Sequence, residues 1–171
     1  MKKTKGLITM KGKPLTLTGN EVKVGEPAPD IELLANDLSG VKLSAFSGKV
    51  CIISSVPSLD TSVCSLQTRR FNEQASRLGD NVVTLTVSMD LPFAQKRWCQ
   101  AEGVESLQTL SDHRNASFGK TYGVLIKELH LLARAVFVVG KDGIVRYKQI
   151  VKELTDEPDY KAVMDAVREL R

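Results

Sequence analysis

The chain has 171 residues, of which 42% are hydrophobic and 26% are charged, and this composition excludes a disordered chain and indicates a folded protein with an apolar core. Its net charge of +4 comes partly from lysines near the N-terminus, but no basic segment with interleaved aromatic residues follows, so nucleic-acid binding has no support. No apolar run reaches the length of a signal peptide or a membrane span, and we therefore expect a cytoplasmic protein without a membrane partner.

Hydrophobic periodicity and turn signals predict an ordered series of strands and helices. The N-terminal part reads as two hairpins, one around the turn 11–14 and one around the turn 36–40. A continuous apolar run predicts a buried strand at 50–53, and the loop after it leads into a helix that Gly79 ends. The elements expected after it are a strand at 82–88, a helix at 93–101, a strand at 107–110, a helical turn at 115–122, a hairpin of strands 135–139 and 144–151, and a final helix opened by Pro158.

The order of these elements predicts the fold class. Strands that alternate with helices in the middle of the chain require parallel strands with helices on the faces of the sheet, and the hairpins add antiparallel strands. We therefore expect an α/β fold of the thioredoxin-like kind, with a mixed sheet sandwiched by helices and an N-terminal β-hairpin. No repeat or linker divides the sequence, which predicts a single domain over residues 1–171 with residues 1–19 as the hairpin extension.

The three cysteines are the residues most informative about function. They form no C-x-x-C pair, so neither a dithiol redox motif nor a zinc site is expected, and a protein with so few cysteines fits a reducing compartment. Cys51 lies inside the buried strand and is expected to be a core residue. Cys64 and Cys99 are therefore the candidates for chemistry.

Cys64 is expected in the first turn of a helix that follows a buried strand. Thr61 is a suitable N-cap and would put Cys64 at the third helical position, where free backbone N–H groups and the helix dipole favour a thiolate. Asp60 opposes that anion, so a cation should lie nearby. Arg134 is the candidate, because it directly precedes a strongly apolar strand; the alternative is that it is a surface charge at the end of that strand.

Other residues of this region are open to two interpretations. The Thr61 hydroxyl could bind a small ligand at the sulfur and Pro57 could shield it, or the two residues could simply form a turn and a helix cap. Cys99 follows Cys64 by 35 positions on a different predicted helix. A disulfide between them would constrain the unfolded chain by about 4 kcal/mol, but the spacing does not determine whether the sulfurs meet.

At these residues the sequence resembles a known family. The segment from Pro57 to Cys64, PSLDTSVC, is similar to the P-x-x-x-T-x-x-C signature of peroxiredoxins, and the residues after it resemble the atypical two-cysteine branch of that family, the bacterial thiol peroxidases. The similarity extends over residues 25–29, 67–73, 90–99, 132–136 and 157–160, and so runs almost from end to end. There are small departures: Cys51 is an additional thiol, Trp98 stands where Phe is expected, and Ser62 replaces Gly or Pro.

The resemblance implies a set of roles. Cys64 would be the peroxidatic cysteine and Cys99 the resolving one, with Thr61 and Arg134 binding and polarising the peroxide and Pro57 shielding the pocket. It implies a thioredoxin-dependent peroxidase that reduces hydrogen peroxide and organic hydroperoxides, acts as a homodimer in antioxidant defence, and needs no cofactor or metal. The two cysteines should lie well apart in the reduced form, and Cys51 remains an alternative disulfide partner.

Three other functions are compatible with some of these features. A redox sensor would undergo the same oxidation but pass its disulfide to a partner protein. A cysteine hydrolase would pair Cys64 with His113 or His130, although neither histidine lies in a recognisable motif. A non-enzymatic binding module of the thioredoxin type would leave the position of Cys64 at a helix start without a purpose.

Overall fold

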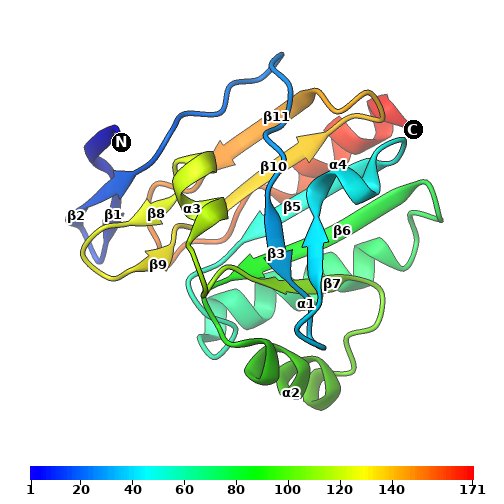
Figure 1. The fold of residues 1–171 in the computed structure, drawn as a ribbon, viewed down its shortest axis with the longest axis horizontal. Coiled ribbons are helices and arrows are strands. Elements are labelled where there is room, and N and C mark those ends of the chain that lie inside the picture. The colour runs from blue at the N-terminus through cyan, green and yellow to red at the C-terminus, as the bar shows by residue number, and fades with distance from the viewer.

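A seven-stranded mixed sheet forms the centre of the protein in the computed structural model, which describes residues 1–171 (Figure 1). The three middle strands run parallel, as predicted, and antiparallel strands flank them on both sides. From one edge to the other, the order is β11 (Val145–Ile150), β10 (Ala135–Val139), β5 (Val50–Ser55), β6 (Val82–Ser88), β7 (Gln108–Ser111), β3 (Glu32–Leu34) and β4 (Gly40–Lys42).

Helices cover both faces of this sheet, which confirms the predicted thioredoxin-like sandwich. On one face, α1 (Ser62–Ala75) and α4 (Tyr160–Leu170) pack their apolar sides against alternate residues of β5 and β10. The other face carries α3 (Ser117–Tyr122), whereas α2 (Pro92–Glu102) packs against β7 on the same face as α1, where Trp98 joins the cluster of Cys64. A short 3-10 helix, Leu43–Phe46, leads from β4 towards β5.

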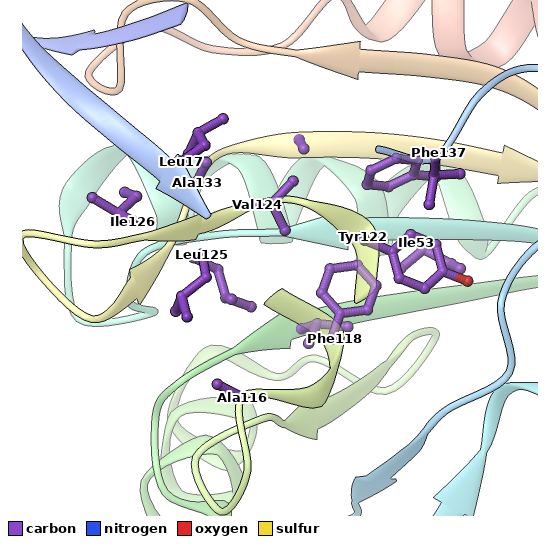
Figure 2. Packing of buried hydrophobic residues seen from close by; sticks show 14 of the residues in the cluster. Leu17, Ile53, Ala116, Phe118, Tyr122, Val124, Leu125, Ile126, Ala133 and Phe137 are labelled. Atoms are coloured by element: carbon purple, nitrogen blue, oxygen red, sulfur yellow. The ribbon is translucent and has the colours of Figure 1, made fainter. Parts of the chain in front are cut away.

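The larger core lies between the sheet and α3. The rings of Phe118 and Tyr122 stack at 4.5 Å, and Tyr122 meets Phe137 of β10 edge-on at 5.2 Å (Figure 2). The side chain of Ile53 from β5 points into the same group. Every residue of β5 and β10 is buried because layers lie on both faces, which explains why these strands read as unbroken apolar runs.

The predicted N-terminal hairpin belongs to a second, smaller sheet. Its strands are β1 (Lys3–Met10) and β2 (Lys13–Thr18), and it continues into β8 (Leu125–Ile126) and β9 (Leu131–Leu132), two strands that the sequence did not predict. Two-residue strands are too short to show an alternating pattern. The turn is also tighter than expected: Lys11 and Gly12 alone close it, both with positive φ, instead of four residues.

Several element boundaries differ from the prediction by a few residues. α3 begins at Ser117 rather than at residue 115, because Ala116 adopts a left-handed conformation with φ of 50°. α4 begins at Tyr160 rather than at Pro158, since the side chain of Asp159 caps it by accepting from the Ala162 amide. None of the helices combines the length and the apolar character that crossing a membrane would need.

Candidate active site

The loop between β5 and α1 brings Cys64 to the third position of α1, where the sequence predicted it. Thr61 has the extended backbone of an N-cap, with φ of −92° and ψ of 148°, but its side chain does not cap the helix. Its hydroxyl donates instead to the Ser58 carbonyl oxygen at 2.9 Å, because the tight turn offers that acceptor nearby. The first amides of α1 therefore keep no side-chain partner and remain available to an anion.

The Cys64 sulfur is completely buried and lies 3.4 Å from Nη2 of Arg134. Arg134 comes 70 positions later, directly before β10, and only 2% of it is exposed. No carboxylate pairs with this guanidinium, as its other partners are a carbonyl and an amide oxygen. Of the groups that contact this buried cation, the Cys64 thiol is the only one that can ionise.

Three hydrogen bonds fix the guanidinium of Arg134. Nε and Nη2 donate to the Leu154 carbonyl oxygen at 3.0 and 2.8 Å, and Nη1 donates to Oε1 of Gln67 at 2.8 Å. Gln67 is itself buried and donates from Nε2 to the Ser54 hydroxyl of β5 at 2.6 Å. The guanidinium is thus held from α1, from β5 through Gln67, and from the loop before α4.

Gln67 was missed by the sequence analysis although a signal for it exists. It follows Cys64 by three positions and therefore lies on the same face of α1, which the hydrophobic pattern assigns to the core. A glutamine on a buried helical face requires polar partners for both of its amide atoms. In this protein those partners are Arg134 and Ser54.

The N-terminal hairpin supports the loop that holds Arg134. The amide of Leu154 donates to the Thr9 carbonyl oxygen at 2.8 Å, and Glu153 accepts hydrogen bonds from the Gly12 amide at 2.9 Å and the Thr9 hydroxyl at 3.0 Å. The Gly12 amide, followed by the amide and hydroxyl of Thr155 and to a lesser degree the Thr9 hydroxyl, lowers the pKa of Glu153 to about 2. The hairpin is therefore joined to the candidate site through residues 153 and 154.

Cys99 lies in the last turns of α2 and has a different environment. It is half-buried, and its sulfur lies 3.6 Å from the hydroxyl of Thr109 on β7, which in turn donates to Oδ1 of Asn36 at 3.0 Å. No cation contacts it, and burial raises the pKa of the Cys99 thiol. Burial alone raises the pKa of Cys51 to about 12, so that thiol is protonated at neutral pH.

All three cysteines are free, and the partners of Cys64 and Cys99 lie on different strands. Arg134 precedes β10, whereas Thr109 lies on β7, and β5 and β6 separate these strands in the sheet. Adjacent strands are about 4.8 Å apart, so the two anchoring strands are separated by about 14 Å. The two sulfurs form no disulfide in this structure, and a disulfide would require them to come within about 2 Å of each other.

The remaining candidates take up less central positions. Pro57 is buried beside the end of β5, and Asp60 is exposed and pairs with Arg97 of α2 at 3.6 Å. His130 is exposed after β8, and His113 contacts the Ser111 hydroxyl at 3.2 Å. Neither histidine reaches Cys64, so the hydrolase interpretation lacks its general base.

A surface hollow with a volume of about 390 Å³ lies between the start of α1 and α2. It is lined by residues 59–62 of the loop, Ser65 of α1, and four residues of α2, which are Arg97, Trp98, Ala101 and Glu102. Trp98 also belongs to a small apolar cluster that contains Cys64, and Cys99 packs against that cluster. The hollow therefore lies between the two helices that carry the cysteines, although neither cysteine lines it.

Comparison with known proteins gives consistent matches over nearly the whole chain. The sequence model of the family described as Redoxin matches residues 23–164. The thiol peroxidase of Halalkalibacterium halodurans is 59% identical, with 94% of this chain and 96% of the relative covered, and that of Bacillus subtilis is 55% identical, with 95% and 97% covered.

Solved structures agree with this assignment. The peroxiredoxin-like protein from Aquifex aeolicus is 43% identical, with a TM-score of 0.90 and 96% of each chain covered. The thiol peroxidase from Chromobacterium violaceum, at 21% identity, has a TM-score of 0.84 with 95% of each chain covered, which shows a shared fold.

Proposed function

The chain belongs to the redoxin family and, within it, to the peroxiredoxins known as thiol peroxidases, and from this premise we propose that it reduces hydroperoxides at Cys64 and resolves the product with Cys99. It is a thiol-dependent peroxidase. The observation that carries the assignment of the reacting thiol is the contact of 3.4 Å between the buried Cys64 sulfur and the guanidinium of Arg134, which has no carboxylate partner.

In the first step the Cys64 thiolate attacks the terminal oxygen of R–O–O–H. The sulfur–oxygen bond forms as the oxygen–oxygen bond breaks, which gives a sulfenic acid at Cys64 and an alkoxide, R–O⁻, that takes a proton to leave as the alcohol. Arg134, the Thr61 hydroxyl and the free amides of α1 would stabilise the developing negative charge. Pro57 would keep water from the loop while this happens. We infer that the hydroperoxide approaches through the hollow between α1 and α2.

In the second step the Cys99 thiol attacks the sulfur of the sulfenic acid. A disulfide between Cys64 and Cys99 forms and one water molecule leaves, with its second proton supplied by the Cys99 thiol. The anchoring of the two cysteines on separate strands supports a local opening before this step. The Cys51 thiol is kept protonated by burial and has no polar partner, which speaks against it as the resolving group.

In the third step a dithiol protein of the thioredoxin type reduces the disulfide by exchange and is itself oxidised. The three free thiols fit a reducing compartment such as the cytoplasm. We further propose that the protein acts as a homodimer in antioxidant defence. The exposed side chains of Leu91 and Phe93, at the start of α2, are apolar residues that a second copy would cover.

Steady-state consumption of hydrogen peroxide and cumene hydroperoxide with thioredoxin, thioredoxin reductase and NADPH tests this function. Cys64→Ser should abolish turnover, whereas Cys99→Ser should consume one equivalent of peroxide and then stop. Mass spectrometry of the parent protein after one equivalent of peroxide should locate a disulfide between Cys64 and Cys99. Sustained turnover by Cys99→Ser with thioredoxin would remove the resolving role of Cys99, and a parent protein that stops after one equivalent would favour the redox sensor.

A further inference from the structure

A partly buried carboxylate joins the two chain segments that carry the reactive cysteines through hydrogen bonds, in addition to the exposed ion pairs Asp60–Arg97 and Arg69–Glu102. Asp90 follows β6 and lies nine residues before Cys99. Its Oδ1 accepts from the Ser58 hydroxyl at 2.7 Å, and its Oδ2 accepts from the Leu59 amide at 2.8 Å. Ser58 and Leu59 belong to the loop that leads into α1 and Cys64.

The other bonds of Asp90 fix it to the sheet rather than to the loop. Oδ2 also accepts from the Ser88 hydroxyl at 2.8 Å, and the backbone carbonyl of Asp90 accepts from the Ser111 hydroxyl of β7. The buried side chain of Gln95 on α2 donates to the Ser88 hydroxyl at 2.9 Å and to the Leu110 carbonyl oxygen at 3.0 Å. The start of α2 is thus tied to β6 and β7 independently of the loop.

The contacts that hold the Cys64 loop depend on Asp90 more than the contacts that hold the start of α2 do, and this difference affects the opening step. The Cys64 loop is held to the rest of the protein near its middle by two bonds to one charged group, and hydrogen bonds to a charged acceptor contribute more than neutral ones. When the bonds between the Asp90 carboxylate and the loop 58–59 break, the start of α2 retains its bonds to Ser88 and Leu110. We call the two bonds from Ser58 and Leu59 to Asp90 the clasp. Its loss therefore frees the loop that leads into Cys64 and leaves the N-terminal part of α2 in place.

We propose that Asp90 is a positioning residue for the peroxidase reaction, which clasps the loop 58–59 while Cys64 meets the peroxide and whose release lets the Cys64 segment unwind towards Cys99. The clasp favours the folded site and so speeds the peroxide step. The same clasp opposes opening and so slows disulfide formation. The role in catalysis rests on the proposed function, but the clasp itself is a property of the reduced protein.

Amide hydrogen exchange of the reduced protein, without any peroxide, tests the clasp directly. In Asp90→Asn the amide nitrogen of the new side chain cannot accept from both donors, so exchange across residues 58–66 should accelerate about tenfold or more. Asp60→Asn is the matched control, since Asp60 lies in the same loop and pairs only with exposed Arg97; its exchange should remain that of the parent. Unchanged exchange in Asp90→Asn would overturn the proposal.

Ser58→Ala provides a milder version that leaves the carboxylate in place. It removes the bond to Oδ1 and also the acceptor of the Asp60 amide, so exchange at Asp60 itself is left out of the comparison; over the remaining residues of 58–66 exchange should accelerate by a few-fold, less than in Asp90→Asn. Ser111→Ala loosens the other side of the turn, and its faster exchange should fall on residues 90–99 instead. If Ser111→Ala released residues 58–66 to the same degree as Asp90→Asn, the proposed asymmetry would be wrong.

Single-turnover kinetics connect the clasp to the reaction. Trp98, the one tryptophan of the chain, lies in the cluster with Cys64 and next to Cys99, so its fluorescence can follow both steps. After one equivalent of hydrogen peroxide, Asp90→Asn should form its sulfenic acid several-fold more slowly and its disulfide several-fold faster than the parent. If both steps slowed in Asp90→Asn, the opening role of Asp90 would be contradicted. If Asp90→Asn showed faster exchange but the parent protein did not react with peroxide, the clasp would stand and the proposed function alone would be contradicted.

Discussion

The surroundings of Cys64 and Cys99 differ in exposure and in charge, and the two differences point to opposite assignments of the nucleophile. Cys64 is completely buried but lies 3.4 Å from a guanidinium that has no carboxylate partner. Cys99 is half-buried, yet its polar neighbour is the neutral hydroxyl of Thr109 at 3.6 Å. If exposure alone assigned the nucleophile, Cys99 would be the better choice. The comparison teaches that the charged neighbour identifies the attacking thiol, while the more accessible thiol is suited to the second step.

The largest expected effect comes from removing the charge that distinguishes the two thiols. Arg134→Gln leaves Cys64 without its cation, and loss of one donor that stabilises a developing anion costs about 10²–10³-fold in rate. Stopped-flow measurement of sulfenic acid formation at neutral pH should show this loss. Arg77→Gln is the control, because Arg77 is exposed just after α1, pairs with Glu73 and lies outside the lining of the hollow. A loss below about threefold in Arg134→Gln would remove the difference on which the comparison rests.

A smaller effect is expected at Gln67, which positions Arg134 but forms no hydrogen bond with the Cys64 sulfur. Gln67→Leu leaves the buried Arg134 Nη1 and the Ser54 hydroxyl unpaired, which should lower the free energy of unfolding by about 1–3 kcal/mol. The peroxide step should slow by about tenfold, since a misplaced guanidinium stabilises the alkoxide less well.

Gln74→Leu is the matched control for this prediction. Gln74 lies on the same helix, and its Oε1 is buried without a partner, so its replacement breaks no bond of that oxygen. Its peroxide step should equal that of the parent. Equal effects of the two substitutions would show that the helix, rather than the network around Arg134, determines the rate.

On the Cys99 side, Thr109→Val should change only the second step. Valine keeps the shape of threonine but removes the hydroxyl that holds the Cys99 sulfur and bonds to Asn36. A hydrogen bond of this kind contributes about 0.5–1.5 kcal/mol, so disulfide formation should become about two- to tenfold faster. Fluorescence of Trp98 after one equivalent of peroxide measures both steps. A change in the first step would mean that the two surroundings are not independent.

The smallest effect concerns Cys51, which is buried but contacts neither a cation, as Cys64 does, nor a hydroxyl, as Cys99 does. Burial raises its pKa from an ordinary value of 9.0 to about 12, so the folded thiol stays neutral while the unfolded one ionises above pH 9. This contribution to stability is complete below pH 9 and is lost as the pH rises from 9 towards 12. In a Cys64→Ser/Cys99→Ser background, Cys51→Ala should therefore lose about 1 kcal/mol less than its parent between pH 8 and pH 10, measured by urea unfolding. Equal losses would show that Cys51 titrates as freely as an exposed thiol.

The sequence predicted the parts of the protein that depend on local pattern. The unbroken apolar runs at β5 and β10 mark strands buried on both faces, and the turn before α1 puts Cys64 at its third position. The place of Arg134 beside Cys64 was also anticipated, because an arginine next to a core strand needs a partner. The roles of Thr61, Pro57 and Cys99 in the reaction remain predictions.

What the sequence could not predict depends on contacts between distant segments. The strands β8 and β9 consist of two residues each and exist because β2 offers an edge to pair with. The bonds of Asp90 to the loop at 58–59 span about 30 positions, and no local pattern indicates them. Thr61 illustrates the opposite limit: its hydroxyl is suited to accept from the first amides of α1 but instead donates to the Ser58 carbonyl oxygen.

The thiolate of Cys64 is the central claim, and ultraviolet absorbance at 240 nm measures it most directly. The Cys51→Ala/Cys99→Ala protein at neutral pH contains one thiol, and its absorbance should fall on acidification or on alkylation by the amount expected for one thiolate. Adding Arg134→Gln to this background should abolish most of that signal, because the buried sulfur then has no cation to hold its charge. The same thiolate absorbance with and without Arg134 would contradict the account.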